Sequence, residues 1–228
     1  MSSTVAVDSD LGVNLRRILG RRTADGLARP SFCPNLAPSL AYGRHRGPAR
    51  DASRRAAVVI ALFQRDGQWM IPLTLRPTSL QHHGGQICLP GGQIEPDESI
   101  TDAALREYEE ELGVKPVVSV HCGQLSPMYV FGSDNRVFPA VVTTQTPSDQ
   151  WRPDPVEVAE VITLPLAELL KSTNRTSVTK SRSVRQNGHT VGHLNYAAPA
   201  IEFDNHSIWG ATALILDELA QLLQSPLN

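Results

Sequence analysis

The chain has 228 residues, of which 41% are hydrophobic and 19% are charged, and its formal net charge is −2. These values are typical of a globular protein with one domain of good size and some additions. The nearly balanced charge gives no reason to expect nucleic acid or a membrane as the main partner. No window of the sequence approaches the length of a transmembrane helix.

The cysteines and the first residues bear on the cellular compartment. Cys33, Cys88 and Cys122 are far apart, and their spacing matches neither a zinc site nor a disulfide framework. The chain start has acidic residues ahead of its apolar ones, unlike a secretory signal. We therefore expect a cytoplasmic protein in a reducing environment.

The first part of the chain is rich in arginine. Residues 1–55 contain ten Arg against four Asp and no Glu, with Pro, Gly and Ser scattered among them. We expect a partly ordered, Arg-rich N-terminal arm over 1–54, with a short amphipathic helix over 11–19, and a folded domain over 55–228. Arginines without interleaved aromatic residues are a weak indication of RNA binding, so we regard nucleic acid as an unlikely partner.

Beyond the arm, strands and helices are mixed. The apolar run 56–63 predicts a buried strand, and a polar break at 64–67 predicts a turn into a second strand, 69–76. Pro96–Ser99 and Gly113 are typical of a helix start and a helix end. Further elements are expected as strands over 86–89, 117–125, 137–144 and 158–165, a short helix from 166, a hairpin or loop over 172–187, and an amphipathic helix within 207–223, beginning near Ile208–Thr212. The order is not a regular βαβ alternation, which favours an α+β fold with a mixed sheet.

The expected helix carries an unusual concentration of acid. Residues 106–113 read REYEEELG, and like charges at i, i+3 and i, i+4 repel each other on a helix. Glu107, Glu110 and Glu111 share one face, and three carboxylates are ligands that suit Mg²⁺ or Mn²⁺. Pro90–Gly92 would let backbone pass close to that face. The segment is either a solvated acidic face or a metal platform suited to a diphosphate.

The wider spacing resembles the Nudix box, G-x5-E-x7-R-E-U-x-E-E-x-G-U, where U is aliphatic. Gly92, Glu98, Arg106-Glu107, Glu110-Glu111 and Gly113-Val114 all fall in place. The single departure is Tyr108, where an aliphatic residue is usual, and it affects packing rather than chemistry. The resemblance implies a Nudix-type α/β/α sandwich.

The resemblance also implies roles for individual residues. The divalent ions would be held by Glu107, Glu110, Glu111 and the carbonyl of Gly91. Structural roles fall to Gly92, Gly113 and a Glu98–Arg106 ion pair that holds loop and helix in register. Glu109 is expected to face solvent.

The implied reaction is attack of water on the phosphorus of a diphosphate, assisted by metal ions. No covalent nucleophile is needed. Glu110 or Glu157 would serve as the base, and a solvent-exposed loop acid is the alternative for Glu157.

A second segment, 73–92, reads LTLRPTSLQHHGGQICLPGG and is similar to the coenzyme A pyrophosphatase branch of the same family. Arg76 and Gln86 are the expected substrate contacts. Gln81 replaces the arginine that this branch usually carries after Leu80. Arginine is well suited to bind phosphate, so its replacement leaves the identity of the substrate open.

The leading hypothesis is therefore Mg²⁺- or Mn²⁺-dependent hydrolysis of coenzyme A or acyl-coenzyme A to 3′,5′-ADP and (acyl-)4′-phosphopantetheine. The same chemistry on ADP-ribose or NADH is the alternative. A sensing module that lacks turnover would be expected to lose box carboxylates, and this chain keeps them all. The expected partner is a small nucleotide, with no membrane, and a homodimer stays open.

Overall fold

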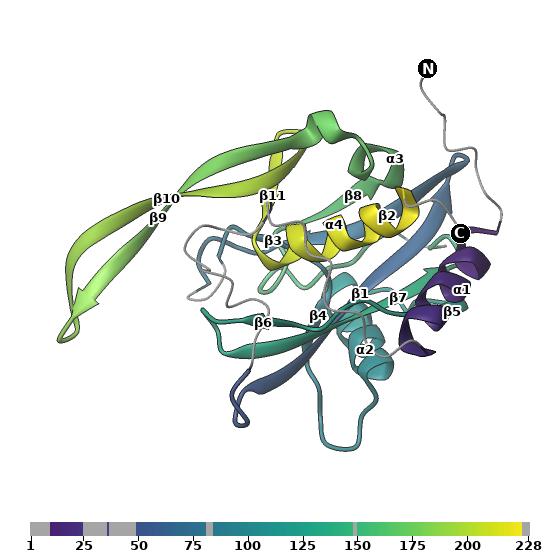
Figure 1. Cartoon of the computed structure of the whole chain (residues 1–228), viewed down its shortest axis with the longest axis horizontal. Helices are drawn as coiled ribbons and strands as arrows, with labels where there is room; N and C mark the ends of the chain where they lie inside the picture. Colours follow the sequence, from purple (N-terminus) through teal and green to yellow (C-terminus); the bar gives the residue numbers. More distant parts are fainter. Residues whose placement is uncertain (1–9, 25–35, 37–48, 81–83, 148–149, 225–228) are drawn as a thin grey trace.

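The computed structural model describes residues 10–24, 36, 49–80, 84–147 and 150–224. Figure 1 shows helices on both sides of a twisted sheet, with one long hairpin that projects from the body. The described elements are, in chain order, α1 (Leu11–Ala24), β1 (Arg54–Arg65), β2 (Gln68–Leu75), β3 (Ile87–Cys88), β4 (Gly91–Gln93), α2 (Ile100–Leu112), β5 (Val118–Gln124), β6 (Met128–Val130), β7 (Asn135–Thr144), β8 (Glu160–Pro165), α3 (Leu166–Leu169), a 3₁₀ turn (Ser172–Asn174), β9 (Arg175–Gln186), β10 (His189–Phe203), β11 (His206–Trp209) and α4 (Ala211–Gln224).

The central sheet is mixed. Its main path runs β3-β2-β1-β7-β5, while β4 also pairs with β1, β6 with β7, and β8 with β2. The long pair β1–β7 is parallel, and the other pairs are antiparallel. The predicted α+β class with a mixed sheet is confirmed.

The central strand β1 is buried on both faces, which explains its continuous apolar run. Successive side chains of a strand point to opposite faces. Ala57, Val59 and Ala61 pack with α2, whereas Ile60 and Leu62 join the second core. That second core contains the buried faces of α1 and α4, so helices cover the two sides of the sheet (Figure 1).

Helix α2 begins and ends close to where the sequence predicts. The Ser99 hydroxyl accepts a hydrogen bond from the Asp102 N–H, and Gly113 ends the helix with φ 66°. Tyr108 is buried against the sheet, and its ring packs edge-on against Trp151 with centroids 6.1 Å apart. The aromatic side chain therefore occupies the position where an aliphatic residue is usual and packs there in an aromatic cluster. The orientation of the acidic face of α2 does not depend on an aliphatic residue at this position.

Helix α1 belongs to the packed core. Leu11, Leu15 and Leu19 are all buried in the second core, and the helix packs against β5. The predicted amphipathic helix is thus present and extends five residues beyond residue 19. Most other residues of the expected arm lie outside the described ranges, so the division into arm and domain stays a prediction.

Two later segments differ in detail from the prediction. Residues 172–187, expected as a hairpin or loop, contain β9, which pairs with β10 along most of its length. Ile208 and Trp209, expected at a helix start, end strand β11 instead, because Gly210 (φ 72°) turns the chain before α4 begins. Trp209 lies at the wall of a pocket. Within the described ranges, no helix is long and apolar enough to cross a membrane.

We expect Leu15→Ala to lower the free energy of unfolding by about 2–5 kcal/mol, because it would leave a cavity beneath α1. Val13→Ala is the matched control: this side chain of the same helix is 51% exposed, and its loss should cost far less. Urea denaturation followed by circular dichroism measures both. Equal, small effects would contradict the packing of α1 on the domain.

Candidate active site

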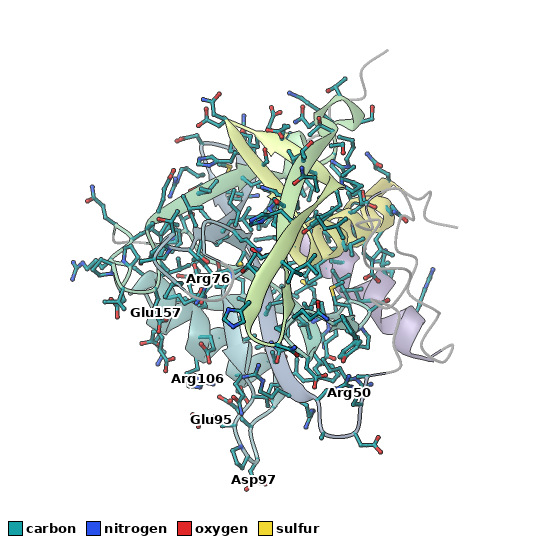
Figure 2. The ribbon with its side chains drawn as sticks, turned by 90° about the vertical axis from the view of Figure 1, so that its left-hand side faces the viewer. Arg50, Arg76, Glu95, Asp97, Arg106 and Glu157 are labelled. Atoms are coloured by element: carbon teal, nitrogen blue, oxygen red, sulfur yellow. The ribbon has the colours of Figure 1, made fainter. Side chains whose placement is uncertain are left out.

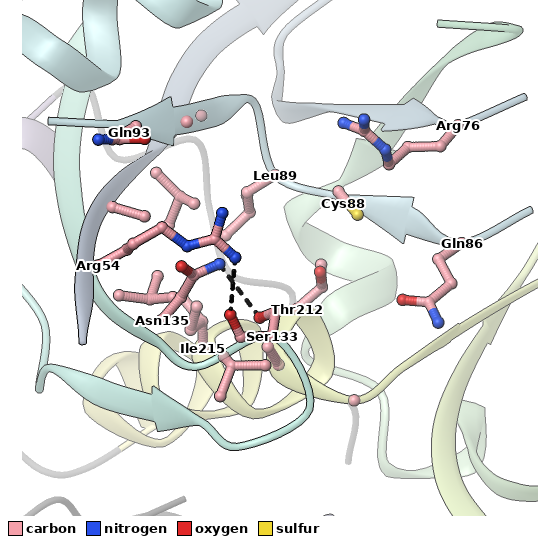
Figure 3. A pocket seen from close by; sticks show the side chains of 18 of the residues that line it. Arg54, Arg76, Gln86, Cys88, Leu89, Gln93, Ser133, Asn135, Thr212 and Ile215 are labelled. Atoms are coloured by element: carbon pink, nitrogen blue, oxygen red, sulfur yellow. Dashed lines mark hydrogen bonds between the residues drawn. The ribbon is translucent and has the colours of Figure 1, made fainter. Parts of the chain in front are cut away.

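A pocket of about 480 Å³ lies between β1, β3, β4, β7 and the start of α4. Five residues that the sequence analysis placed in the site line it: Arg76, Gln86, Gly91, Gly92 and Glu111. Figure 3 shows Arg76 and Gln86 on one side of this pocket, with Cys88 between them. Residues separated by as many as 35 positions in sequence are thereby brought to one cavity.

Glu111 is the most enclosed of the box carboxylates. Only 3% of it is exposed, its Oε1 lies 3.7 Å from Nη1 of Arg76, and its Oε2 is within 3.4 Å of the Thr74 hydroxyl. Burial raises the pKa of Glu111 to about 8, and the positive charge of Arg76 opposes that rise. A cation bound nearby would strongly stabilise the charged form of such a buried carboxylate.

Glu107 lies against the glycine loop. A Cβ atom at Gly92 would overlap the Glu107 carboxylate and displace it, whereas at Gly91 (φ 157°) a Cβ would overlap the backbone of Ala57 and Val58, so the approach of the loop requires glycine there. Burial raises the pKa of Glu107, while the hydrogen bond from Arg106 lowers it. Glu107 thus lies against the backbone of β4, and Glu111 lies at the floor of the pocket.

Arg106 joins the loop to the helix. Its Nε and Nη2 donate to the two carboxylate oxygens of Glu98 at 3.0 and 3.2 Å, and Nη2 also donates to the Gln93 carbonyl. This hydrogen bonding holds the pKa of Glu98 below its ordinary value. The ion pair that the resemblance implied is present, and Gly113 caps the same helix.

The two proposed bases lie outside the pocket wall. Glu110 is 57% exposed at its side chain, and its Oε2 lies 3.2 Å from Nη1 of Arg106. Glu157 is exposed in the turn after Asp154, yet its charge raises the pKa of both Glu107 and Glu111. Figure 2 shows Glu157 on the same side of the molecule as Arg76 and Arg106. The catalytic roles of Glu110 and Glu157 stay predictions.

The donor set suits a hard divalent cation, although its side chains are not gathered around one point. Among the described residues, no group of three His, Cys, Asp or Glu side chains is arranged to hold a metal ion. Nη1 of Arg106 hydrogen-bonds both Glu107 and Glu110, and so draws these two carboxylates to itself. Three carboxylates on one helix face, next to a loop that only glycine permits, nevertheless fit the cation chemically. The ligand roles of Glu107, Glu110, Glu111 and Gly91 stay predictions.

Several residues in or beside the pocket escaped the sequence analysis. Thr74, which does not line the pocket but contacts Glu111, could have been found, because it lies near the end of β2, two positions before Arg76. Thr212, Asn135 and Arg54 come from distant segments, and no pattern in the sequence connects them with the box. Burial raises the pKa of Cys88 to about 11, so this thiol is not a nucleophile at neutral pH. Gln81 lies outside the described residues.

Gly92→Ala should weaken Mn²⁺ binding by at least about tenfold, since the new methyl group displaces a carboxylate that we expect to be a ligand. Gly132→Ala, where a Cβ would meet nothing within 4 Å, is the control and should bind Mn²⁺ normally. Isothermal titration calorimetry measures both. Unchanged affinity in Gly92→Ala would argue against Glu107 as a ligand.

The raised pKa of Glu111 also predicts a pH effect on the metal-free protein. Between about pH 4.5 and 8 the folded state keeps the proton that the unfolded state has lost, so stability falls as pH rises through this window. Thermal unfolding in EDTA should show a steeper loss of stability for the native chain than for Glu111→Gln. Parallel pH profiles would contradict the assigned burial.

Comparison with known proteins places the chain in a family. The NUDIX domain profile matches residues 53–183, which include the whole pocket except its α4 and β11 wall. "Mitochondrial coenzyme A diphosphatase NUDT8" of Homo sapiens is 35% identical over 188 residues, covering 81% of this chain and 75% of that protein. "Uncharacterized Nudix hydrolase NudL" of Photorhabdus laumondii is 33% identical over 175 residues, covering 76% and 87%.

A solved structure also overlaps with this one. The MutT protein from Methanosarcina mazei Go1 shares 24% identity with this chain at a TM-score of 0.42, over 53% of this chain and 84% of that chain. The domain profile extends over more than half of the sequence, and Gly92 and Glu111 of the box within it line the pocket. The chain belongs to the Nudix hydrolase family.

Proposed function

We propose that this Nudix hydrolase cleaves the diphosphate bond of coenzyme A or acyl-coenzyme A, with Mg²⁺ or Mn²⁺ as cofactor. The products would be 3′,5′-ADP and (acyl-)4′-phosphopantetheine. The observation that carries the proposal is the meeting of Glu111, the Gly91–Gly92 loop, Arg76 and Gln86 in one pocket. The name of the human relative and the resemblance of segment 73–92 to the coenzyme A branch support this substrate.

In such a reaction, different residues would hold the ions, orient the helix, contact the substrate and accept a proton. The ions would be held by Glu107, Glu110, Glu111 and the Gly91 carbonyl. When bound, they would neutralise phosphate charge and lower the pKa of a bound water. Arg106 and Glu98 orient the helix against the loop. Arg76 would contact a phosphate oxygen, because its Nε is buried and has no hydrogen-bond partner in the structure. Glu110 or Glu157 would accept the proton of the attacking water.

A closely related substrate is the second candidate. Gln81 stands in place of the arginine that the coenzyme A branch usually carries. This replacement favours a nucleotide whose binding requires one positively charged side chain fewer. ADP-ribose and NADH are such nucleotides, and both contain the same diphosphate linkage. The predicted cytoplasmic location and the assembly state stay predictions; the human relative is named as mitochondrial.

A substrate panel with product identification by mass spectrometry tests the proposal. Coenzyme A, an acyl-coenzyme A, ADP-ribose and NADH should be compared at equal concentration with Mg²⁺ and with Mn²⁺. We expect 3′,5′-ADP from the first two at the highest kcat/KM. Faster hydrolysis of ADP-ribose or NADH would select the second candidate.

Glu111→Gln should lower kcat by a factor of about 100 or more, because it removes a carboxylate charge at the floor of the pocket without changing its shape. Glu109→Gln is the matched control: Glu109 is exposed on the same helix, and its variant should keep normal turnover. Circular dichroism verifies that both variants fold. Near-normal turnover of Glu111→Gln would remove this residue from the catalytic machinery.

A further inference from the structure

The pocket has a second polar end, away from the box carboxylates. Arg54, Ser133 and Asn135 line this end, and the pocket wall also contains apolar side chains, among them Leu89 and Ile215. Figure 3 shows the Arg54 side chain extending into the pocket on the side opposite Arg76 and Gln86. The cavity therefore has polar groups at two opposite ends.

Arg54 holds a positive charge that no described carboxylate pairs with at salt-bridge distance. Within the described part of the chain, its one side-chain hydrogen bond runs from Nη2 to the carbonyl oxygen of Ser133, at 3.0 Å. By contrast, Arg106 is shared among three carboxylates and Arg175 pairs with Asp217. A guanidinium has five N–H donors, so Arg54 keeps most of its donors for a ligand.

The nearest acidic side chain is engaged elsewhere. The Asp134 carboxylate accepts hydrogen bonds from the Ser53 hydroxyl at 2.7 Å and from the Tyr129 hydroxyl at 2.6 Å. These bonds hold the pKa of Asp134 below its ordinary value. The Asp134 backbone carbonyl accepts from the Arg54 N–H, which fixes the start of β1 beside this turn. The charge of Arg54 also contributes to the lowered pKa of Asp134, so Arg54 lies near the Asp134 carboxylate, but the two groups form no ion pair at salt-bridge distance.

The two neighbouring arginines direct their guanidinium groups elsewhere, although Arg55 also contributes to the pocket wall. The Arg55 and Arg136 guanidinium groups both lie over the ring of Phe138, at 5.3 and 5.0 Å from its centroid. Phe138 packs with the core on the α2 side of the sheet. Because side chains alternate along β1, Arg54 points to the other side, where the pocket lies.

We propose that Arg54 binds a phosphate monoester of the substrate, separate from the diphosphate that is cleaved. On the proposed coenzyme A substrate, on which this inference rests, that group is the 3′-phosphate of the ribose. Val58 pairs with Gly91, and Arg54 is four residue steps from Val58, a distance of about 13 Å along β1. The long Arg54 side chain extends into the pocket (Figure 3), where it would meet the ribose that adjoins the diphosphate. Arginine is suited to the task because it can donate two parallel hydrogen bonds to a phosphate.

The first test is binding without turnover. The full chain in EDTA is titrated with 3′,5′-ADP and with 5′-AMP, which differ only in the 3′-phosphate. We expect the native chain to bind 3′,5′-ADP about tenfold or more tightly than 5′-AMP, and Arg54→Gln to lose most of this preference. Arg54→Lys should recover part of it. Arg136→Gln, which removes the same charge from a strand position outside the pocket, should leave the preference intact.

The second test is kinetic. Arg54→Gln should lower kcat/KM for coenzyme A by about 10- to 100-fold and leave kcat/KM for 3′-dephospho-coenzyme A within about twofold. Either of two results would overturn the role of Arg54. The first is a native chain that does not prefer 3′,5′-ADP to 5′-AMP. The second is an Arg54→Gln variant whose affinity or kcat/KM changes equally for the compounds with and without the 3′-phosphate. If coenzyme A is not cleaved but the preference for 3′,5′-ADP depends on Arg54, the proposed function fails and the phosphate site stands.

Discussion

The site depends on the enclosure of two carboxylates between helix α2 and the sheet. Glu111 is buried beneath Arg76 and Thr74, and Glu107 is pressed against the backbone of Gly92. Burial raises the pKa of both groups, so each keeps its negative charge only at a cost that a nearby cation reduces. The hydrophobic packing of α2 on β1, through Ala103, Ala104, Tyr108 and Leu112, holds them there.

Arg106 is the internal cation of this arrangement. Its contacts with Glu98, Glu107, Glu110 and the Gln93 carbonyl connect the loop, the helix and the acidic cluster. Buried or half-buried charges are tolerated when they are paired and hydrogen-bonded, and Arg106 supplies both functions. The same contacts draw Glu110 away from Glu111, so a bound cation would compete with Arg106 for the Glu107 and Glu110 carboxylates.

Much of the site could be predicted because its residues lie close together in the chain. The box from Gly92 to Gly113 is local: a helix places residues i, i+3 and i+4 on one face, and a glycine at φ 66° ends that helix. Arg76 and Gln86, the predicted substrate contacts, lie on the pocket wall, and their role in binding stays a prediction. Trp209 was misplaced, because an apolar stretch beside Gly210 fits a helix start as well as a strand end.

The linear sequence alone determined the acidic helix face, the glycine loop and the alternation of apolar and polar elements, since each follows from local geometry and spacing. Only the tertiary structure decided which distant groups share the pocket. Arg54, Asn135 and Thr212 come from β1, β7 and α4, and the pairing of β1 with β7 and the docking of α4 bring them together. These contacts depend on strand register and on buried apolar surface summed over the whole domain, which no short window of sequence contains.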